Sequence, residues 1–390
     1  MTPAARIGAA IDLIDRIQAG ELADGALADW GRKNRYAGSK DRAAIGDIVY
    51  DVLRKRQSFA LLGGGETGRA LLLGYVRASG KDPKSVFGAD RYAPRELSND
   101  ELSSDQLAQV KLSEVSDFPD WLWPYLVRSH GDRALSIARA LRDRAPVHLR
   151  VNLQKLSRDT AIASLAEEGV ETEPLGLSPS ALQVVEGARR IRNSISYQNG
   201  IVELQDASSQ AVADLVPLGQ GETLLDFCAG AGGKVLAIAG RTTGIFFAHD
   251  IEKHRMKDLP KRAKRADVRV SRITLEEIDD VQQRFDTVLV DAPCSGSGSW
   301  RRDPQGKWLL TPDKLDRILT SQKEILDRAA QLVKPGGHLV YSTCSLLDCE
   351  NELQMKEFLT RSVDFSTIVE QHFSPLSESD GFYCSVLRKD

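Results

Sequence analysis

The stretch LLDFCAGAGGK, residues 224–234, decides the fold of the larger part of this chain. A short apolar run passes directly into a run rich in glycine, which is the pattern of a buried strand that turns into a helix. Glycine there lets the backbone approach a ligand closely, beside the N-terminus of the following helix. Four more apolar segments follow, IFFAHD, VRVSRI, TVLVDA and HLVYSTC, with helical stretches between most of them. This alternation predicts an α/β domain over residues 206–390, with a mostly parallel sheet and helices on both faces.

The chain before residue 206 divides into three further segments. Residues 1–80 are expected to form a small all-helical domain, because Ile7, Ile11 and Ile14 recur at helical spacing and a second apolar face begins near Ser39. Residues 81–117 are polar and poorly periodic, which predicts a linker. Residues 118–205 mix helical stretches with short strands such as VHLRVN and IVELQ, which indicates a small α+β domain.

Length and composition exclude several classes of protein. A chain of 390 residues is long enough for roughly two or three domains. It has no apolar run of about 18 residues and no secretory signal pattern, so we expect a cytoplasmic protein that does not enter a membrane. Its five cysteines lack zinc-type spacing, which favours reduced thiols and no metal site. The formal net charge is −3, so a nucleic-acid contact would have to come from local patches, and we expect a monomer.

The spacing within the glycine run indicates which ligand it suits. A phosphate-binding P-loop would need glycine at Cys228 and a hydroxyl residue at Val235, and the dinucleotide fingerprint starting at Gly230 would need a small residue at Val235. Asp250 ends the second strand, where a carboxylate can accept hydrogen bonds from ribose hydroxyls. A nucleoside cofactor without a pyrophosphate, S-adenosylmethionine, fits these constraints. The alternative interpretation is a tight structural turn followed by an unrelated aspartate.

Two cysteines stand at the ends of predicted strands. Cys294 lies in DAPCSGSG after the fourth strand, and Cys344 ends the fifth, so both belong to the edge where ligands of such sheets bind. Cys349 and Cys384 are interpreted as ordinary small buried residues. A thiolate added to carbon 6 of a pyrimidine makes carbon 5 able to accept a methyl group, and a base must then remove the carbon 5 proton. Two thiols beside a methyl-donor site therefore indicate methylation at carbon 5 of a pyrimidine.

Several motifs together resemble the RsmB/Nop/Sun family of RNA cytosine-C5 methyltransferases: QDASSQ, FCAGAGGK, DAPCSGSG, YSTCS and the terminal GFYCSVLRK. The resemblance covers residues 118–390, and the helices of residues 1–80 are similar to the NusB-type RNA-binding domain found in this family. It implies a Rossmann-like methyltransferase domain in which Cys344 is the nucleophile, Cys294 assists proton removal and product release, and Asp291 lies near both cofactor and target base. It also implies that the methionine end of the cofactor is held by Cys228, Ala229, Gly230, Ala231, Gly232, Gly233 and Lys234.

The chain departs from the family pattern in two places. CAGAGGK stands where CAAPGGK is common, and Thr274, with Glu276 and Glu277 nearby, stands where an aspartate near the adenine is common. We expect these differences to lower cofactor affinity and to leave the cysteine chemistry intact.

Cations close to the reactive edge are the expected RNA contacts. Arg301, Arg302 and Lys307 directly follow DAPCSGSG and could hold phosphates while the target base swings out toward the thiol. Arg150 lies in the α+β domain, whose family counterpart contacts RNA. The basic run of residues 253–272 is either a solvated helix face or a further contact. The NusB-like helices point to 16S ribosomal RNA as substrate. Transfer RNA, a catalytically silent ribosome assembly factor and a DNA cytosine methyltransferase with its nucleophile in a Pro-Cys pair remain alternatives.

Overall fold

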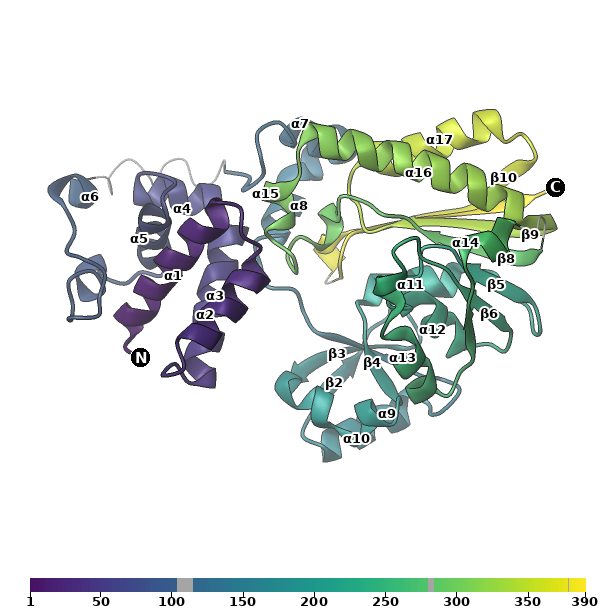
Figure 1. Cartoon of the computed structure of the whole chain (residues 1–390), viewed down its shortest axis with the longest axis horizontal. Coiled ribbons are helices and arrows are strands. Elements are labelled where there is room, and N and C mark those ends of the chain that lie inside the picture. The colour runs from purple at the N-terminus through teal and green to yellow at the C-terminus, as the bar shows by residue number, and fades with distance from the viewer. Residues whose placement is uncertain (104–114, 280–283, 378) are drawn as a thin grey trace. The chain divides into compact units, whose positions relative to one another are not determined.

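The computed structural model describes residues 1–103, 115–279, 284–377 and 379–390 (Figure 1). The chain folds into two compact units. The first unit comprises residues 1–144 and 300–309, and the second comprises residues 145–299 and 310–390. None of the helices within these described ranges is both long and apolar enough to cross a membrane.

The first unit is helical, as predicted for its N-terminal part. Thr2 caps the first helix by accepting a hydrogen bond from the Ala5 amide, and Pro3 occupies the first turn, where its missing N–H costs nothing. Thr67 caps α5 in the same way, through the Ala70 amide. The α-helices of this unit are α1 Pro3–Gln18, α2 Ala23–Lys33, α3 Ser39–Arg54, α4 Arg56–Gly63, α5 Gly68–Ala78, α6 Asn99–Ser103, α7 Trp123–His130, α8 Ala134–Ala140 and α15 Gly306–Leu309.

The first unit extends beyond the boundary expected from the sequence. Val86 and Phe87, in the expected linker, pack into the core of the N-terminal helices. Asp117 is buried, accepts hydrogen bonds from the amide and hydroxyl of Ser58, and pairs with Arg142. Residues 117–144 are therefore part of the helical unit, because their polar and apolar contacts are made there. The remainder of the expected linker, residues 104–114, lies outside the described residues.

The second unit begins with a small α+β domain. Its four-stranded antiparallel sheet has the order β2-β3-β1-β4, and Leu149, Leu165 and Leu182 lie in the core between sheet and helices. The elements are β1 His148–Val151, α9 Arg158–Glu167, β2 Glu171–Pro174, β3 Ala181–Glu186, α10 Ile195–Gln198 and β4 Val202–Leu204.

The rest of the second unit is a seven-stranded sheet of order β10-β11-β9-β8-β5-β6-β7. The five strands expected from the sequence are present and parallel to one another, and β11 runs antiparallel between β9 and β10. Residues of α11–α13 enter the core on one face, and residues of α14, α16 and α17 enter the core on the other (Figure 1). The elements are α11 Ala207–Leu215, β5 Thr223–Asp226, α12 Gly233–Ala239, β6 Ile245–Ala248, α13 Leu259–Ala266, β7 Val270–Arg272, α14 Leu275–Asp279, β8 Phe285–Asp291, α16 Pro312–Leu332, β9 Val333–Thr343, α17 Glu352–Arg361, β10 Phe365–Phe373 and β11 Phe382–Lys389.

Candidate active site

The two cysteines singled out from the sequence face each other at the carboxyl edge of the large sheet. Cys294 follows β8 and Cys344 follows β9, and their sulfur atoms are 3.3 Å apart. The backbone holds the two loops in register, since the Ala292 amide donates to the Ser342 carbonyl at 2.9 Å and the Gly298 amide donates to the Cys344 carbonyl at 2.9 Å. The hydrogen bond with Cys344 and burial raise the pKa of the Cys294 thiol well above its usual range. The sequence correctly placed both thiols at one edge.

A buried lysine lies beside this pair. Lys234, at the start of α12, places its ammonium nitrogen 2.7 Å from an Asp291 carboxylate oxygen, and the Ser342 hydroxyl donates to the other oxygen at 3.1 Å. Burial opposes the charge on Lys234, but the adjacent Asp291 carboxylate outweighs it, so the pKa of Lys234 is raised. The lysine therefore stays charged close to the thiol pair.

The glycine loop between β5 and α12 is fixed by contacts with Leu259 and Arg150. Gly232 is the N-cap of α12 and has a φ of 81°, and a Cβ there would lie 2.3 Å from a Leu259 methyl, so only glycine fits. Arg150 donates to the Gly233 carbonyl at 2.9 Å and also to the Gln205 side-chain carbonyl. Burial of Arg150 lowers its pKa to about 10. Arg150 thus supports the loop, and its guanidinium is not presented to an RNA phosphate as the sequence suggested.

Three carboxylates gather at the ends of β5, β6 and β8. Asp250 is buried and accepts hydrogen bonds from the amides of Gly230 and Glu252, at 2.8 and 2.9 Å. Asp226 is buried as well, and its Oδ1 has no hydrogen-bond partner among the described residues. Burial and the nearby Asp291 raise the pKa of Asp226 to about 7. No group of His, Cys, Asp and Glu in the described ranges is arranged to hold a metal ion. The cluster instead favours an organic ligand that brings positive charge and hydrogen-bond donors.

Sequence reasoning missed Asp226 and a second buried acid, Glu350. Asp226 is the last residue of β5, so the rule that ligands bind at the carboxyl ends of strands could have found it. Glu350 lies beyond Cys344 in the acidic run DCENE, and nothing in that run distinguishes a buried acid from a solvated one.

The cations that follow DAPCSGSG do not behave as the sequence suggested. Residues 300–309 belong to the first unit, where the side chains of Arg301 and Lys307 are 4% and 2% exposed. The Lys307 ammonium donates to the Arg54 carbonyl at 2.9 Å, and burial lowers its pKa to about 7. The structure does not support the predicted phosphate contacts of Arg301 and Lys307, because a polyanion cannot reach buried side chains. Arg302 is exposed.

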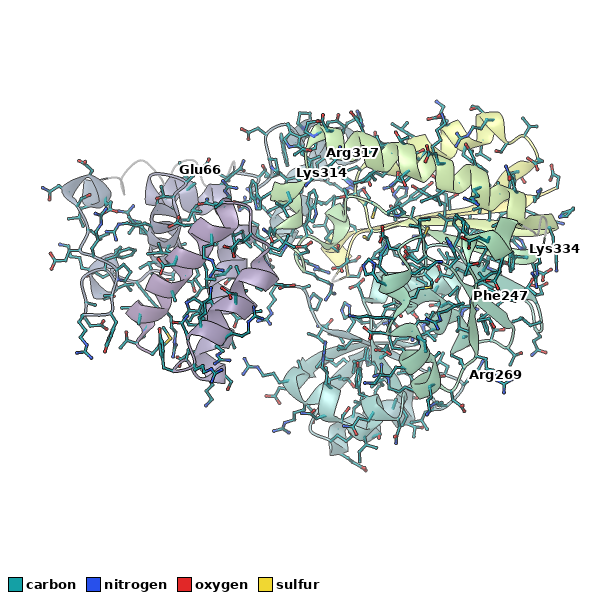
Figure 2. The ribbon with its side chains drawn as sticks, in the orientation of Figure 1. Glu66, Phe247, Arg269, Lys314, Arg317 and Lys334 are labelled. Carbon is teal, nitrogen blue, oxygen red and sulfur yellow. The ribbon has the colours of Figure 1, made fainter. Side chains whose placement is uncertain are left out.

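The second basic run, residues 253–272, is divided between internal pairs and the surface. Arg262 and Arg265 pair with Glu203 of β4. Arg255 lies 3.4 Å from the Asp250 carboxylate. Seven cations of this run are exposed, and Figure 2 shows Arg269 at the surface: Lys253, Arg255, Lys257, Lys261, Lys264, Arg269 and Arg272. Thr274 directly precedes α14, and its hydroxyl and the Glu277 carboxylate each accept a hydrogen bond from the other residue's amide. This capping box accounts for the threonine that departs from the family pattern.

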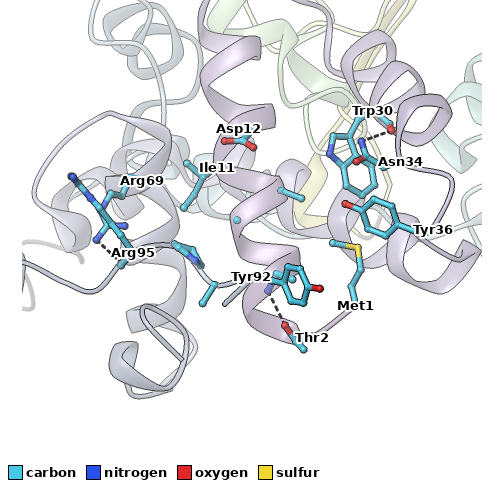
Figure 3. Close-up of a pocket in the computed structure, with 15 residues that line it drawn as sticks. Met1, Thr2, Ile11, Asp12, Trp30, Asn34, Tyr36, Arg69, Tyr92 and Arg95 are labelled. Carbon is cyan, nitrogen blue, oxygen red and sulfur yellow. Dashed lines mark hydrogen bonds between the residues drawn. The ribbon is translucent and has the colours of Figure 1, made fainter. Parts of the chain in front are cut away.

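The first unit contains a cavity of about 970 Å³, formed by α1, the end of α2 and the segment around Tyr92 (Figure 3). Trp30, Tyr36 and Tyr92 line it together with Arg69 and Arg95. The side chains of Tyr36 and Tyr92 are 73% and 60% exposed, which is unusual for rings of this size. The cavity therefore offers the ring of Tyr36 to solvent, whereas the Arg91 guanidinium lies over one face of Tyr92, 4.4 Å from its ring centroid.

Two segments of the chain match models of known protein families. Residues 213–387 match the 16S rRNA methyltransferase RsmB/F model, and residues 118–190 match the ferredoxin-like domain of RsmF/B-like methyltransferases. Ribosomal RNA small subunit methyltransferase B is 34% identical to this chain in Vibrio cholerae, over 283 residues, and 34% identical in Escherichia coli, over 289 residues. These matches cover 70% of this chain and 65% and 66% of the two relatives, just under two thirds of their length. The crystal structure of the protein PH0851 shares the fold over 100% of this chain and 99% of that chain, with a TM-score of 0.77 at 23% identity.

Proposed function

We propose that this chain is a member of the RsmB/F family and methylates carbon 5 of a cytosine in small-subunit ribosomal RNA with S-adenosylmethionine as methyl donor, because its ferredoxin-like and methyltransferase segments match the models of that family. The observation that carries this proposal is the pair of thiols 3.3 Å apart beside the glycine loop. Carbon 5 of cytosine is too weak a nucleophile to take a methyl group unaided. A thiolate at carbon 6 removes that obstacle, and a second group must then help to restore the ring.

The residues present fit this cofactor. When bound, S-adenosylmethionine supplies a methyl group on a positively charged sulfur that carbon 5 can attack. Three carboxylates gather here, of which Asp291 pairs with Lys234 and Asp250 lies 3.4 Å from the Arg255 guanidinium, and the surplus of negative charge disfavours a pyrophosphate. The unpartnered Oδ1 of buried Asp226 is an acceptor for a ligand N–H or O–H group. Asp250 would hold the ribose, since a carboxylate offers about four acceptor positions, and two backbone amides and the Arg255 guanidinium 3.4 Å away leave room for a hydroxyl.

The chain's own groups divide the work as follows. Cys344 Sγ, with the Lys234 charge close by, adds to carbon 6 as the thiolate, so that a carbon–sulfur bond forms and carbon 5 gains the electron density of the ring double bond. Once carbon 5 carries the methyl group, it also carries a proton that has to leave. Cys294 assists its removal, the double bond re-forms, and the Cys344–carbon 6 bond breaks. The salt bridge between Asp291 and Lys234 keeps two charges fixed beside the reacting ring.

RNA binding by the first unit is assigned to its aromatic cavity rather than to residues 300–308. Unstacked bases of single-stranded RNA bind flat aromatic rings largely independently of sequence. Tyr36 and Tyr92 supply such rings, and Arg95 and Arg69 lie in the same lining. Arg69 is paired with Glu101, so stacking and not charge is expected to dominate there.

The direct test is methyl transfer from isotope-labelled S-adenosylmethionine to RNA from a strain that lacks this protein. We expect label in small-subunit ribosomal RNA, located at a single cytosine by bisulfite sequencing. Label in transfer RNA or in duplex DNA would replace the proposed substrate by that nucleic acid. No label in any of the three, with RNA still bound, would favour a catalytically silent assembly factor.

A further inference from the structure

Glu350 connects the two cysteine loops. It lies in the turn between β9 and α17, and its side chain is fully buried. One carboxylate oxygen accepts hydrogen bonds from the Ser295 amide at 2.8 Å and from Gln322 at 3.1 Å. The other oxygen accepts from the hydroxyl of Ser295 at 2.5 Å and from the hydroxyl of Ser345. Ser295 follows Cys294 and Ser345 follows Cys344, so one carboxylate holds the residue after each thiol.

The same network reaches the other side of Cys294. Gln322 of α16 donates to the Pro293 carbonyl at 2.9 Å as well as to Glu350. Tyr341 of β9 donates its hydroxyl to the Glu350 carbonyl at 2.7 Å, which fixes the turn itself. Both neighbours of Cys294 in the chain are therefore held by Glu350 or by its partner.

The two thiols interact with different charged groups, Cys294 with Glu350 and Cys344 with Lys234. Burial raises the pKa of the Glu350 carboxyl and outweighs its four hydrogen bonds, which lower it and of which two come from N–H groups that can only donate, so the pKa is raised overall. The negative charge of Glu350 is among the causes that raise the pKa of Cys294, after the Cys344 hydrogen bond, burial and the Cys344 charge. The cation Lys234, with its partner Asp291, interacts instead with Cys344. Of the other titratable groups, Tyr341 interacts with Glu350, Cys294, Cys349 and Tyr383.

We propose that Glu350 is the positioning residue that gives the two thiols different roles, because its buried carboxylate fixes both loops and contacts the Cys294 loop through both the amide and the hydroxyl of Ser295. The roles rest on the proposed function, whereas the difference between the thiols exists in the protein alone. Cys294 is then neutral when Cys344 attacks and does not compete with it for the target base, and it loses its own proton to solvent before it accepts the proton from carbon 5. Without the Glu350 charge, the two thiols would become more alike.

The test is Glu350→Gln, which removes the charge and keeps the contacts. The amide oxygen can accept from the two N–H donors, and the amide nitrogen can donate to the two serine hydroxyls, which rotate to accept. The readout is the rate of alkylation by iodoacetamide, in which a thiolate sulfur forms a bond to carbon and iodide leaves. Each thiol is followed by peptide mass spectrometry at low extent of modification over a range of pH, with protein alone.

We expect Glu350→Gln to accelerate alkylation of Cys294 by about fivefold or more at neutral pH and to move its pH profile to lower pH, with Cys344 within about twofold of wild type. Glu352→Gln is the matched control, since Glu352 lies two residues further on, outside the hydrogen-bond network of Glu350, and should leave both rates unchanged. Unchanged Cys294 alkylation in a folded Glu350→Gln protein would overturn the proposal. Equal acceleration of both thiols would also overturn it, because that result indicates loosened loops only.

The wild-type protein gives a second test if the variant does not fold. The pH profile of Cys294 alkylation should lie above that of an ordinary cysteine, whose pKa is about 8.5. A profile at or below this value would contradict the proposal. Because the assay uses neither RNA nor cofactor, failure of methyl transfer to ribosomal RNA would leave its result standing.

Discussion

Two adjacent stretches of the chain, residues 291–298 and residues 300–308, belong to different compact units and behave differently. In DAPCSGSG, a thiol lies 3.3 Å from a second thiol and an aspartate pairs with a buried lysine. In WRRDPQGKW, the lysine is buried and is bonded to a carbonyl of α3. Proximity in sequence to a reactive motif therefore does not place a charged residue in the site. What counts is whether the fold already provides a partner for that side chain.

The largest difference between the two stretches should appear in catalysis. Asp291→Asn removes the charge that pairs with buried Lys234 beside the two thiols, so we expect methyl transfer to fall by about 10²- to 10³-fold. Asp303→Asn, in the second stretch, should stay within about threefold of wild type. The measurement is the steady-state rate of methyl transfer by each variant. Equal losses of rate would contradict the difference between the two stretches.

The second prediction concerns Asp226 in the absence of cofactor. Its pKa is about 7 in the folded protein, above the ordinary value, so the folded state binds this proton more tightly than the unfolded chain. Its contribution to stability is present below pH of about 4 and is lost as the pH rises through 7, at most about 4 kcal/mol. Asp226→Asn should therefore flatten the pH dependence, measured by hydrogen exchange of β5 and α12 at pH 5 and pH 8. Parallel profiles for variant and wild type would count against a strained carboxyl at this position.

Lys307 should show the opposite sign in the first unit. Burial lowers its pKa to about 7, so the cost of burying it is full below pH 7 and is relieved as the pH rises toward the ordinary lysine value. Lys307→Met should stabilise the first unit at pH 7 by about 3 kcal/mol, after the loss of the hydrogen bond to Arg54, and the gain should shrink toward pH 10. All five tryptophans lie in the first unit, so denaturation followed by tryptophan fluorescence reports on it. A destabilised variant at pH 7 would show that the ammonium is needed.

The smallest effect is expected at the aromatic cavity. Tyr36→Ala and Tyr92→Ala should each weaken binding of a small-subunit ribosomal RNA fragment by about 1–3 kcal/mol, without changing its salt dependence, because a ring and not a charge is lost. Leu22→Ala, an exposed apolar residue of the same unit, is the control in fluorescence anisotropy titrations. Affinities equal to wild type would move RNA selection away from this cavity.

The sequence alone predicted which residues lie at the carboxyl ends of the strands. Apolar runs end directly in Cys228, Asp250, Asp291 and Cys344, and a parallel sheet brings such ends to one edge. The fold class followed from the same alternation. β10 and β11 were not expected as strands, because the last motif was interpreted only as a family signature.

The remainder depended on contacts between distant residues. The buried state of Lys307 depends on Arg54, and the role of Arg150 depends on Gly233. The role proposed for Glu350 depends on its hydrogen bonds from Ser295 and Gln322, and no local sequence pattern connects either residue to it. Partners so far apart in the chain become visible only when the fold is known.

The central claim, that Cys344 attacks and Cys294 serves the later elimination, is tested most directly by covalent trapping on RNA. Cys294→Ala should attack and methylate, then stall, and accumulate as a protein–RNA species that survives denaturing gel electrophoresis. Cys344→Ala should bind RNA and cofactor and form no such species. A species trapped by Cys344→Ala and absent from Cys294→Ala would contradict the account and assign the nucleophile to Cys294.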